Sequence, residues 1–254
     1  MGFAETAKKI RDAAVKYGGS YIPYSQCVPP TSTLIESMPQ TSDGICKALS
    51  AKWIVEHSNG SSLFNWLCTP GTLNVRQSAV ANLMLNFMDG TETTGAFKNR
   101  SWFRKGSMRK EYKSRQNHLS RQTFMTDKYL QLYGLKRRNG LRGVGMNDNP
   151  ISVGANGSAL ANMFDSRYLN TKGETYMTIG ILGDAGGHAL AGYCAGKEVI
   201  LFDPNYGEFY FPSYDMSYPW IQYFYVASDY ISDFDTFYML GYAKDATGNW
   251  KKYK

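Results

Sequence analysis

Three short segments, far apart along the chain, contain the residue types that catalysis by a thiol nucleophile requires. Cys46 opens a helix-like run, His188 follows two glycines, and Asp203 precedes a proline. A thiol attacks only as its thiolate, so it needs a nearby imidazole and is helped by a helix N-terminus, which favours the anion. A carboxylate would orient the imidazole. Because 142 residues separate Cys46 from His188 and 15 separate His188 from Asp203, the three can meet only where two parts of one fold face each other.

Each of these residues also has a plain structural interpretation. A cysteine at a helix start can be a small buried hydrophobic group. A histidine can be buried with its ring bonded to a carbonyl oxygen, and an aspartate before proline can cap a turn. The turn and the catalytic role are compatible for Asp203, because Pro204 would stiffen the position of the carboxylate. The order of the three residue types favours catalysis.

The elements that must position these residues divide the chain near residue 172. Residues 4–16 predict an amphipathic helix, and residues 17–40, rich in Pro, Gly and Ser, predict an irregular arm. Residues 46–57 predict a helix with Cys46, Leu49, Trp53 and, more loosely, Ile54 on one face. Ser42 or Asp43 is expected as its N-cap. Further helices are expected over the ranges 74–88 and 126–133.

Strand patterns follow this helical half. Strands are expected over residues 175–182, 189–194, 198–202, 208–211 and 237–243, with a turn at 203–207 and a helix near 220–230. Helices followed by an antiparallel sheet predict an α+β fold. We expect one catalytic domain over residues 40–254, preceded by an N-terminal extension or pro-like arm over residues 1–39.

The formal charge of +7 is concentrated in one segment. Residues 98–142 contain fourteen Lys and Arg against two acidic residues, a net charge of +12, so the remainder of the chain is at −5. Such a segment is either a solvated face or a surface that attracts anions. It matches no helix-turn-helix, RNP or zinc-finger pattern, so nucleic acid is an unlikely partner. An anionic membrane surface or an acidic substrate loop fits better.

The composition indicates neither metal nor cofactor. The four cysteines (Cys27, Cys46, Cys68 and Cys194) form no CxxC pair, and with the three histidines they show no zinc-ligand spacing. We expect the cysteines to be reduced. No apolar run approaches the roughly 20 residues of a membrane helix, and the first residues lack the apolar region of a signal peptide.

The stretches GICKALSAKWI, GHALAGY and FDPNYGEF resemble the YopT and AvrPphB family of papain-fold cysteine proteases, which are bacterial effectors. The resemblance covers residues 40–58 and 172–245. It implies a papain-like fold in which a helical half carrying the cysteine packs on an antiparallel sheet carrying the histidine and aspartate. It also implies Cys46 as nucleophile, His188 as base and Asp203 as the orienting group.

The resemblance extends to the oxyanion hole and to the place of action. Papain-like enzymes commonly pair the cysteine N–H with a side-chain amide a few residues upstream, which implies Gln40, six residues before Cys46; Thr41 stands where some relatives have an amide. Effectors of this family cleave host proteins, and several process themselves. We therefore expect secretion into a host or target cell without a Sec signal, action in the cytosol or at the inner membrane face, and self-cleavage between Gly18 and Thr41. Gly2 fits the N-myristoylation pattern.

Two other classes of function stay open. The same three residues serve deamidating and transglutaminase-like toxins, in which a Gln side chain is attacked or an amine releases the acyl-enzyme. Alternatively, the motifs are relics in a non-enzymatic binding module whose working surface is the basic segment.

Overall fold

The computed structural model describes residues 2–37, 45–83, 126–138, 151–152, 157–167, 169, 172–183 and 186–244. Most of the basic segment, including residues 98–125 and 139–142, lies outside these ranges. The same is true of Gln40 and of the proposed boundary between residues 39 and 40. The division into an extension and a catalytic domain stays a prediction.

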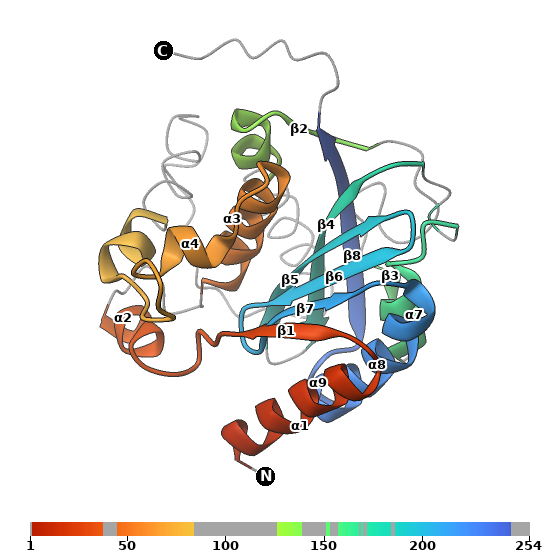
Figure 1. Ribbon diagram of the computed structural model, residues 1–254, viewed down its shortest axis with the longest axis horizontal. Helices are drawn as coiled ribbons and strands as arrows, with labels where there is room; N and C mark the ends of the chain where they lie inside the picture. Colours follow the sequence, from red (N-terminus) through yellow and green to blue (C-terminus); the bar gives the residue numbers. More distant parts are fainter. Residues whose placement is uncertain are drawn as a thin grey trace, which may run out of the picture.

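An antiparallel sheet runs through the centre of the molecule (Figure 1). Its spatial order is β1 (Ser20–Pro23), β7 (Gly207–Phe211), β6 (Glu198–Asp203), β5 (Gly186–Ala195), β4 (Thr175–Gly183), β8 (Thr236–Lys244) and β2 (Leu135–Arg137), and β3 (Ile151–Ser152) also pairs with β8. The five predicted strands are all present as β4 to β8. The predicted α+β class is confirmed.

Helices cover both faces of this sheet. Glu208 and Phe209 are neighbours on β7, so their side chains point to opposite faces. Glu208 accepts a hydrogen bond from Trp53 Nε1 (2.6 Å), whereas the Phe209 ring lies 4.6 Å from that of Trp220. Helices α3 (Cys46–Ser58) and α8 (Tyr214–Ala227), which carry these tryptophans, therefore lie on opposite faces.

The remaining helices are short or lie at the ends of the chain. They are α1 (Phe3–Lys16), α2 (Thr31–Ser37), α4 (Leu63–Leu67), α7 (Gly157–Asn162) and α9 (Tyr230–Asp233), and residues 77–83 and 126–132 are also helical. The part of the predicted helix 74–88 beyond residue 83 lies outside the described residues. Helix α8 begins at Tyr214, earlier than expected, because the Ser213 hydroxyl caps it by accepting a hydrogen bond from Met216 N. None of the described helices is long and apolar enough to cross a membrane.

Helix α3 is a central helix rather than a surface helix. Residues 48–55 are all buried, because the sheet covers one side of the helix and other helical segments cover the rest. The face that carries Leu49, Trp53 and Ile54 is buried as predicted, together with the other sides of this part of the helix. Even Lys52 is buried, where its ammonium group pairs with Glu56 Oε1 at 2.5 Å and lies 4.6 Å from the Trp66 ring centroid.

The predicted irregular arm forms regular structure instead. Residues 20–23 are strand β1, which pairs with β7 at the edge of the sheet, and residues 31–37 are helix α2. The amphipathic helix predicted over residues 4–16 is present as α1 and packs onto the same core, where Ile10 is fully buried and its carbonyl oxygen accepts a hydrogen bond from Trp220 Nε1 (3.1 Å). Proline and glycine frequency indicated turns here, whereas strand pairing across nearly 190 residues decides the structure.

Close packing across the sheet leads to a stability prediction at Gly180. This residue of β4 is the register partner of Tyr238 on β8, and a Cβ at Gly180 would lie 1.9 Å from Tyr238 Cε1. We expect Gly180→Ala to lower the free energy of unfolding in urea by about 1 to 3 kcal/mol, the usual cost of overpacking. The cost should shrink when Tyr238→Ala is combined with it, and equal costs in both backgrounds would contradict this explanation.

Candidate active site

His188 and Asp203 lie on adjacent strands and are joined directly. The register of β5 and β6, with Ala191 opposite Phe202, places both side chains on the same face of the sheet. His188 Nε2 and Asp203 Oδ1 are 2.8 Å apart. Asp203 has no exposed surface and His188 is 8% exposed, so water does not screen this contact appreciably.

Cys46 is the first residue of α3, and the register of the sheet explains how it reaches His188. Residues 186–190 of β5 pair with β4, but the pairing of β5 with β6 begins only at Ala191. The free edge of this part of β5 contacts the start of α3. Ser50, one turn after Cys46 on the same side of the helix, donates a hydrogen bond to the Ala189 carbonyl oxygen (3.1 Å). The backbone N–H of Ala189 interacts with the Cys46 sulfur.

Among the described residues, no side chain caps the helix start. The N-cap is Ile45, whose side chain cannot accept a hydrogen bond, and the predicted caps Ser42 and Asp43 lie outside the described residues. The backbone N–H groups of the first helical turn have no acceptor within the helix itself. They add to the positive end of the helix dipole, which favours an anion at this position.

The electrostatics favour a charged pair. Burial alone would raise the pKa of Cys46, but the hydrogen bond and positive charge of His188 outweigh burial, and the Ala189 N–H and Lys47 act in the same direction, so that the pKa is lowered. Burial alone would lower the pKa of His188, but the charge and hydrogen bond of Asp203, together with Cys46, raise it to about 10. A thiolate beside an imidazolium is the nucleophilic form of a thiol.

The Asp203 carboxylate is held by two more groups that the sequence did not indicate. The backbone N–H of Asn205 donates to Oδ1 (2.7 Å), and the Tyr230 hydroxyl donates to Oδ2 (2.9 Å). The Tyr230 ring also lies 5.5 Å from the His188 ring, centroid to centroid. Asn205 was visible as part of the Asp-Pro-Asn turn, but no sequence signal marked Tyr230.

The N-terminal part of the chain also reaches the site. Cys27, interpreted from the sequence as a core or loop residue, is exposed and its thiol donates to Asn205 Oδ1 (3.1 Å) across 178 residues. Burial of its sulfur and the charges of Asp203 and Cys46 raise the pKa of the Cys27 thiol. It is therefore a second thiol near the site, with a pKa shifted in the opposite direction to that of Cys46.

The other candidate ligands lie elsewhere. Cys68 and Cys194 are buried and free, and His57 packs among the rings of Trp53, Tyr176 and Tyr193. Gln40, the expected oxyanion-hole residue, lies outside the described residues. Over the part of the chain that the structure describes, no group of three His, Cys, Asp or Glu side chains could hold a metal ion.

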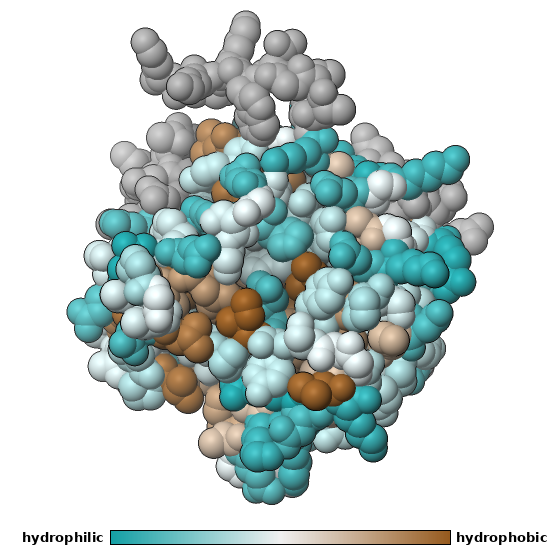
Figure 2. Space-filling model, in the orientation of Figure 1, coloured by the Kyte–Doolittle hydropathy of each residue, from teal (hydrophilic) through white to brown (hydrophobic). Residues whose placement is uncertain are grey.

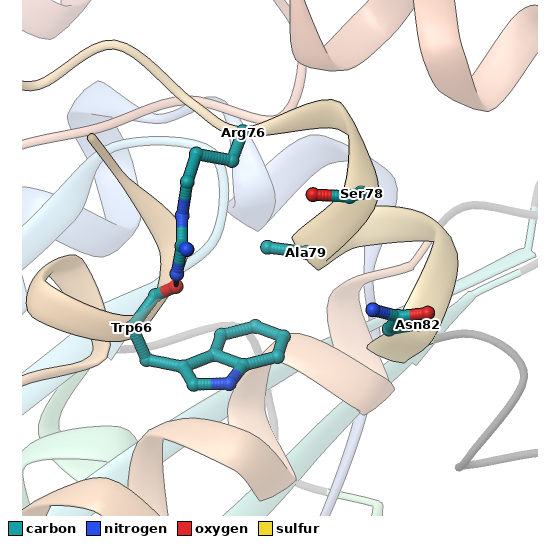
Figure 3. A pocket seen from close by; sticks show the side chains of 5 residues that line it. All are labelled: Trp66, Arg76, Ser78, Ala79 and Asn82. Atoms are coloured by element: carbon teal, nitrogen blue, oxygen red, sulfur yellow. Dashed lines mark hydrogen bonds between the residues drawn. The ribbon is translucent and has the colours of Figure 1, made fainter.

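One surface pocket is separate from this cluster. It lies between α4 and the helix at residues 77–83 and is lined by Trp66, Arg76, Ser78, Ala79 and Asn82, with the Arg76 guanidinium donating to the Trp66 carbonyl oxygen (Figure 3). Its polar side chains are exposed, and it shares no residue with the Cys46 cluster. On the face of the molecule in Figure 2, apolar groups form separate patches on a largely hydrophilic surface.

Comparisons with known proteins agree with the geometry. The protein-family model Peptidase_C58, described as Yersinia/Haemophilus virulence surface antigen, matches residues 31–233. The cysteine protease YopT of Yersinia enterocolitica is 25% identical over 213 residues, and that of Yersinia pestis is 26% identical over 216 residues. Each alignment covers 80% of this chain and 56% of the relative, so the chain spans just over half the length of these curated relatives.

A solved structure establishes the fold independently. The crystal structure of the Pseudomonas avirulence protein AvrPphB superimposes with a TM-score of 0.51 at 19% identity, covering 81% of this chain and 95% of that one. The predicted papain-like arrangement, with a helical half packed on an antiparallel sheet, is therefore confirmed.

Proposed function

Because the chain belongs to the Peptidase_C58 family, we propose that it is a cysteine protease that hydrolyses peptide bonds, with Cys46 as nucleophile, His188 as base and Asp203 as the orienting group. The observation that carries this proposal is the arrangement of the three side chains. His188 Nε2 is bonded to Asp203 at 2.8 Å, and the interaction of His188 with Cys46 lowers the pKa of the thiol.

The hydrogen bond between His188 and Asp203 determines the role of each nitrogen of the His188 ring. Nε2–H donates to Oδ1 of the carboxylate, which can only accept, so Nδ1 is the nitrogen left for Cys46. The thiolate attacks the peptide carbonyl carbon, forming the C–S bond. Nδ1–H then gives its proton to the leaving amine as the C–N bond breaks. The neutral imidazole next takes a proton from water, which attacks the acyl-enzyme and releases the acid and the free thiolate.

The oxyanion of the tetrahedral intermediate needs fixed donors. The backbone N–H of Cys46, at the start of α3, is one candidate, and the helix dipole there favours negative charge. Gln40 remains the proposed second donor.

The substrate class follows from the family. The similarity to the YopT cysteine proteases supports a protein substrate, and membership of a virulence family supports delivery into a host or target cell. Action in the cytosol or at the inner membrane face stays a proposal. So does binding of the basic segment to an anionic membrane, which co-sedimentation with anionic against neutral vesicles would test.

We also predict self-processing between Gly18 and Thr41. Within this range, residues 27–30 are exposed and lie between β1 and α2, so a cut there requires less unfolding than a cut in either element. This stretch begins beside the site, at Cys27. We expect the intact mass of the wild type to fall during incubation while that of Cys46→Ala stays constant. Identical masses would count against self-processing.

The proposed function is tested by mapping new chain ends. Wild-type protein and Cys46→Ala are incubated in parallel with a target-cell lysate, and protein N-termini are identified by mass spectrometry. New N-termini confined to the wild-type sample are expected. Glutamine residues that gain about 1 Da without a chain break would indicate a deamidase instead. No covalent change, together with Cys46 labelling no faster than Cys27, would favour the binding module.

A further inference from the structure

Behind the His188 and Asp203 pair lies a chain of hydrogen bonds that the proposed mechanism does not use. It links Asp203 to Tyr230, Tyr230 to Asn205, and Asn205 to Gln26. Asn205 Nδ2 donates to the Tyr230 hydroxyl oxygen (3.0 Å), and Gln26 Nε2 donates to Asn205 Oδ1 (2.8 Å). These hydrogen bonds join four places in the sequence: Gln26 after β1, Asp203 at the end of β6, Asn205 in the turn after β6, and Tyr230 at the start of α9.

The direction of every bond in this chain is determined by the carboxylate. Asp203 can only accept, so the Tyr230 hydroxyl must give it its single proton. The hydroxyl oxygen is then an acceptor, which fixes the amide of Asn205 with Nδ2 toward Tyr230 and Oδ1 toward Gln26. Because Asn205 Oδ1 accepts, the Gln26 group that faces it must be the Nε2 donor. No member can rotate its polar group without losing a bond.

These hydrogen bonds matter for stability because the groups that form them are shielded from water. Asp203 is fully buried, Tyr230 is 5% exposed and Gln26 is 8% exposed. A carboxylate oxygen that lost its donor here could not form a replacement hydrogen bond to bulk water. Leaving such a buried group unpaired costs free energy. Gln26 is held further by its backbone N–H, which donates to the Pro204 carbonyl oxygen (2.7 Å).

We propose that Tyr230 and Asn205 are positioning residues of the active site, and that Gln26 anchors them from the N-terminal part of the chain. Tyr230 fixes the carboxylate plane of Asp203 through Oδ2 and supports the His188 ring by contact. Asn205 fixes Tyr230 and, through its backbone N–H, the other carboxylate oxygen. This inference rests on the proposed function, because it assigns a role relative to the same Cys46 and His188.

The other titratable groups around the cluster come from each element that packs on it. They are Lys47 on α3, Cys27 after β1, Tyr206 in the turn, and Asp229 before α9. The pKa values of Cys27 and Tyr206 are raised, chiefly by burial, and burial with the Asp203 charge also raises the pKa of Tyr230. Raised pKa values keep Cys27, Tyr206 and Tyr230 in their neutral forms to higher pH than usual, whereas the pKa of Cys46 is lowered.

The test is the pH dependence of Cys46 alkylation, which needs no substrate. Wild type and Tyr230→Phe are treated with iodoacetamide between pH 4 and 10, and the modification of each cysteine is followed by peptide mass spectrometry. Tyr230→Phe keeps the ring but removes the hydroxyl that donates to Asp203. The Asp203 carboxylate is then oriented less well and stabilises the His188 imidazolium less. We expect the midpoint for Cys46 to rise by about one pH unit, equivalent to an about tenfold lower rate at acidic pH. Asn205→Ala should change it in the same direction.

Tyr225→Phe is the matched control. Its hydroxyl is also partly buried and donates to a carbonyl oxygen, that of Phe234 (2.9 Å), away from the triad, so the Cys46 midpoint should not change. An unchanged midpoint in Tyr230→Phe would overturn the inference, as would an equal shift in both variants. Labelling of the buried Cys68 and Cys194 would reveal that Tyr230→Phe is unfolded. In that case, the Cys46 midpoint of Asn205→Ala tests the inference instead. If wild-type Cys46 shows no acid-shifted midpoint, the proposed function fails instead.

Discussion

Replacing Cys46 with alanine is expected to lower peptide-bond hydrolysis by about 10⁴-fold or more, because the attacking atom is removed and no other group described at the site can replace it. The fold should survive. Cys46 is only partly buried, and the backbone contacts of α3 and the Ser50 bond to Ala189 do not involve its sulfur. The measurement is the rate of product formation on a substrate found by N-terminal mapping, together with the urea midpoint of each protein.

Cys27→Ser is the appropriate control for this variant. Cys27 also lies at the site, and its thiol donates to Asn205, a bond that a serine hydroxyl can reproduce. Its pKa is raised rather than lowered, so it should not act as a nucleophile, and Cys27→Ser should keep most of the activity. If Cys46→Ala retained activity and Cys27→Ser lost it, the assignment of the nucleophile would be reversed.

Local sequence patterns were sufficient to predict most of the helices and strands. Short runs of apolar, β-branched or small residues predicted β4 to β8, and the turn signal at Asp203-Pro204-Asn205 marked where β6 ends. Helix α3 was placed to within one residue. Its burial on all sides was not foreseen, because periodicity reports an apolar face only where the opposite face meets water, and Lys52 hides its charge in a pair with Glu56.

Contacts between segments that are far apart in the sequence could not be predicted from local patterns. The N-terminal residues appeared irregular because Pro23 and the neighbouring glycines suggest turns, yet β1 is stabilised by pairing with β7. The same pairing brings Gln26 and Cys27 to the site. Tyr230 is one of nineteen tyrosines, and nothing in its local sequence separates it from the others. Its role is visible only from the 2.9 Å contact with Asp203.

A second large effect is expected from His188→Gln, and its sign follows from the charges. In the wild type, the His188 imidazolium lowers the pKa of Cys46, so the thiolate forms at a lower pH than that of an ordinary thiol. The pKa of His188 is raised to about 10, so the ion pair is lost only as the pH rises through about 10. The wild-type rate should therefore increase as the pH rises through the lowered pKa of Cys46 and fall again near pH 10.

Glutamine can still donate to Asp203, but it carries no proton to give to the leaving amine and no positive charge. Without the imidazolium, burial raises the pKa of Cys46 and is opposed by the weaker effects of the Ala189 N–H, Lys47 and the helix start, so the acidic limb should move to higher pH, toward the ordinary value of about 8.5. Turnover at neutral pH should fall by about 10³-fold or more, since both the base and the thiolate are lost. His57→Gln, at the opposite end of α3, should leave the Cys46 alkylation profile unchanged. If His188→Gln kept the acid-shifted profile of the wild type, the thiolate would owe its stability to the helix start rather than to the imidazolium, and the ion-pair mechanism would be wrong.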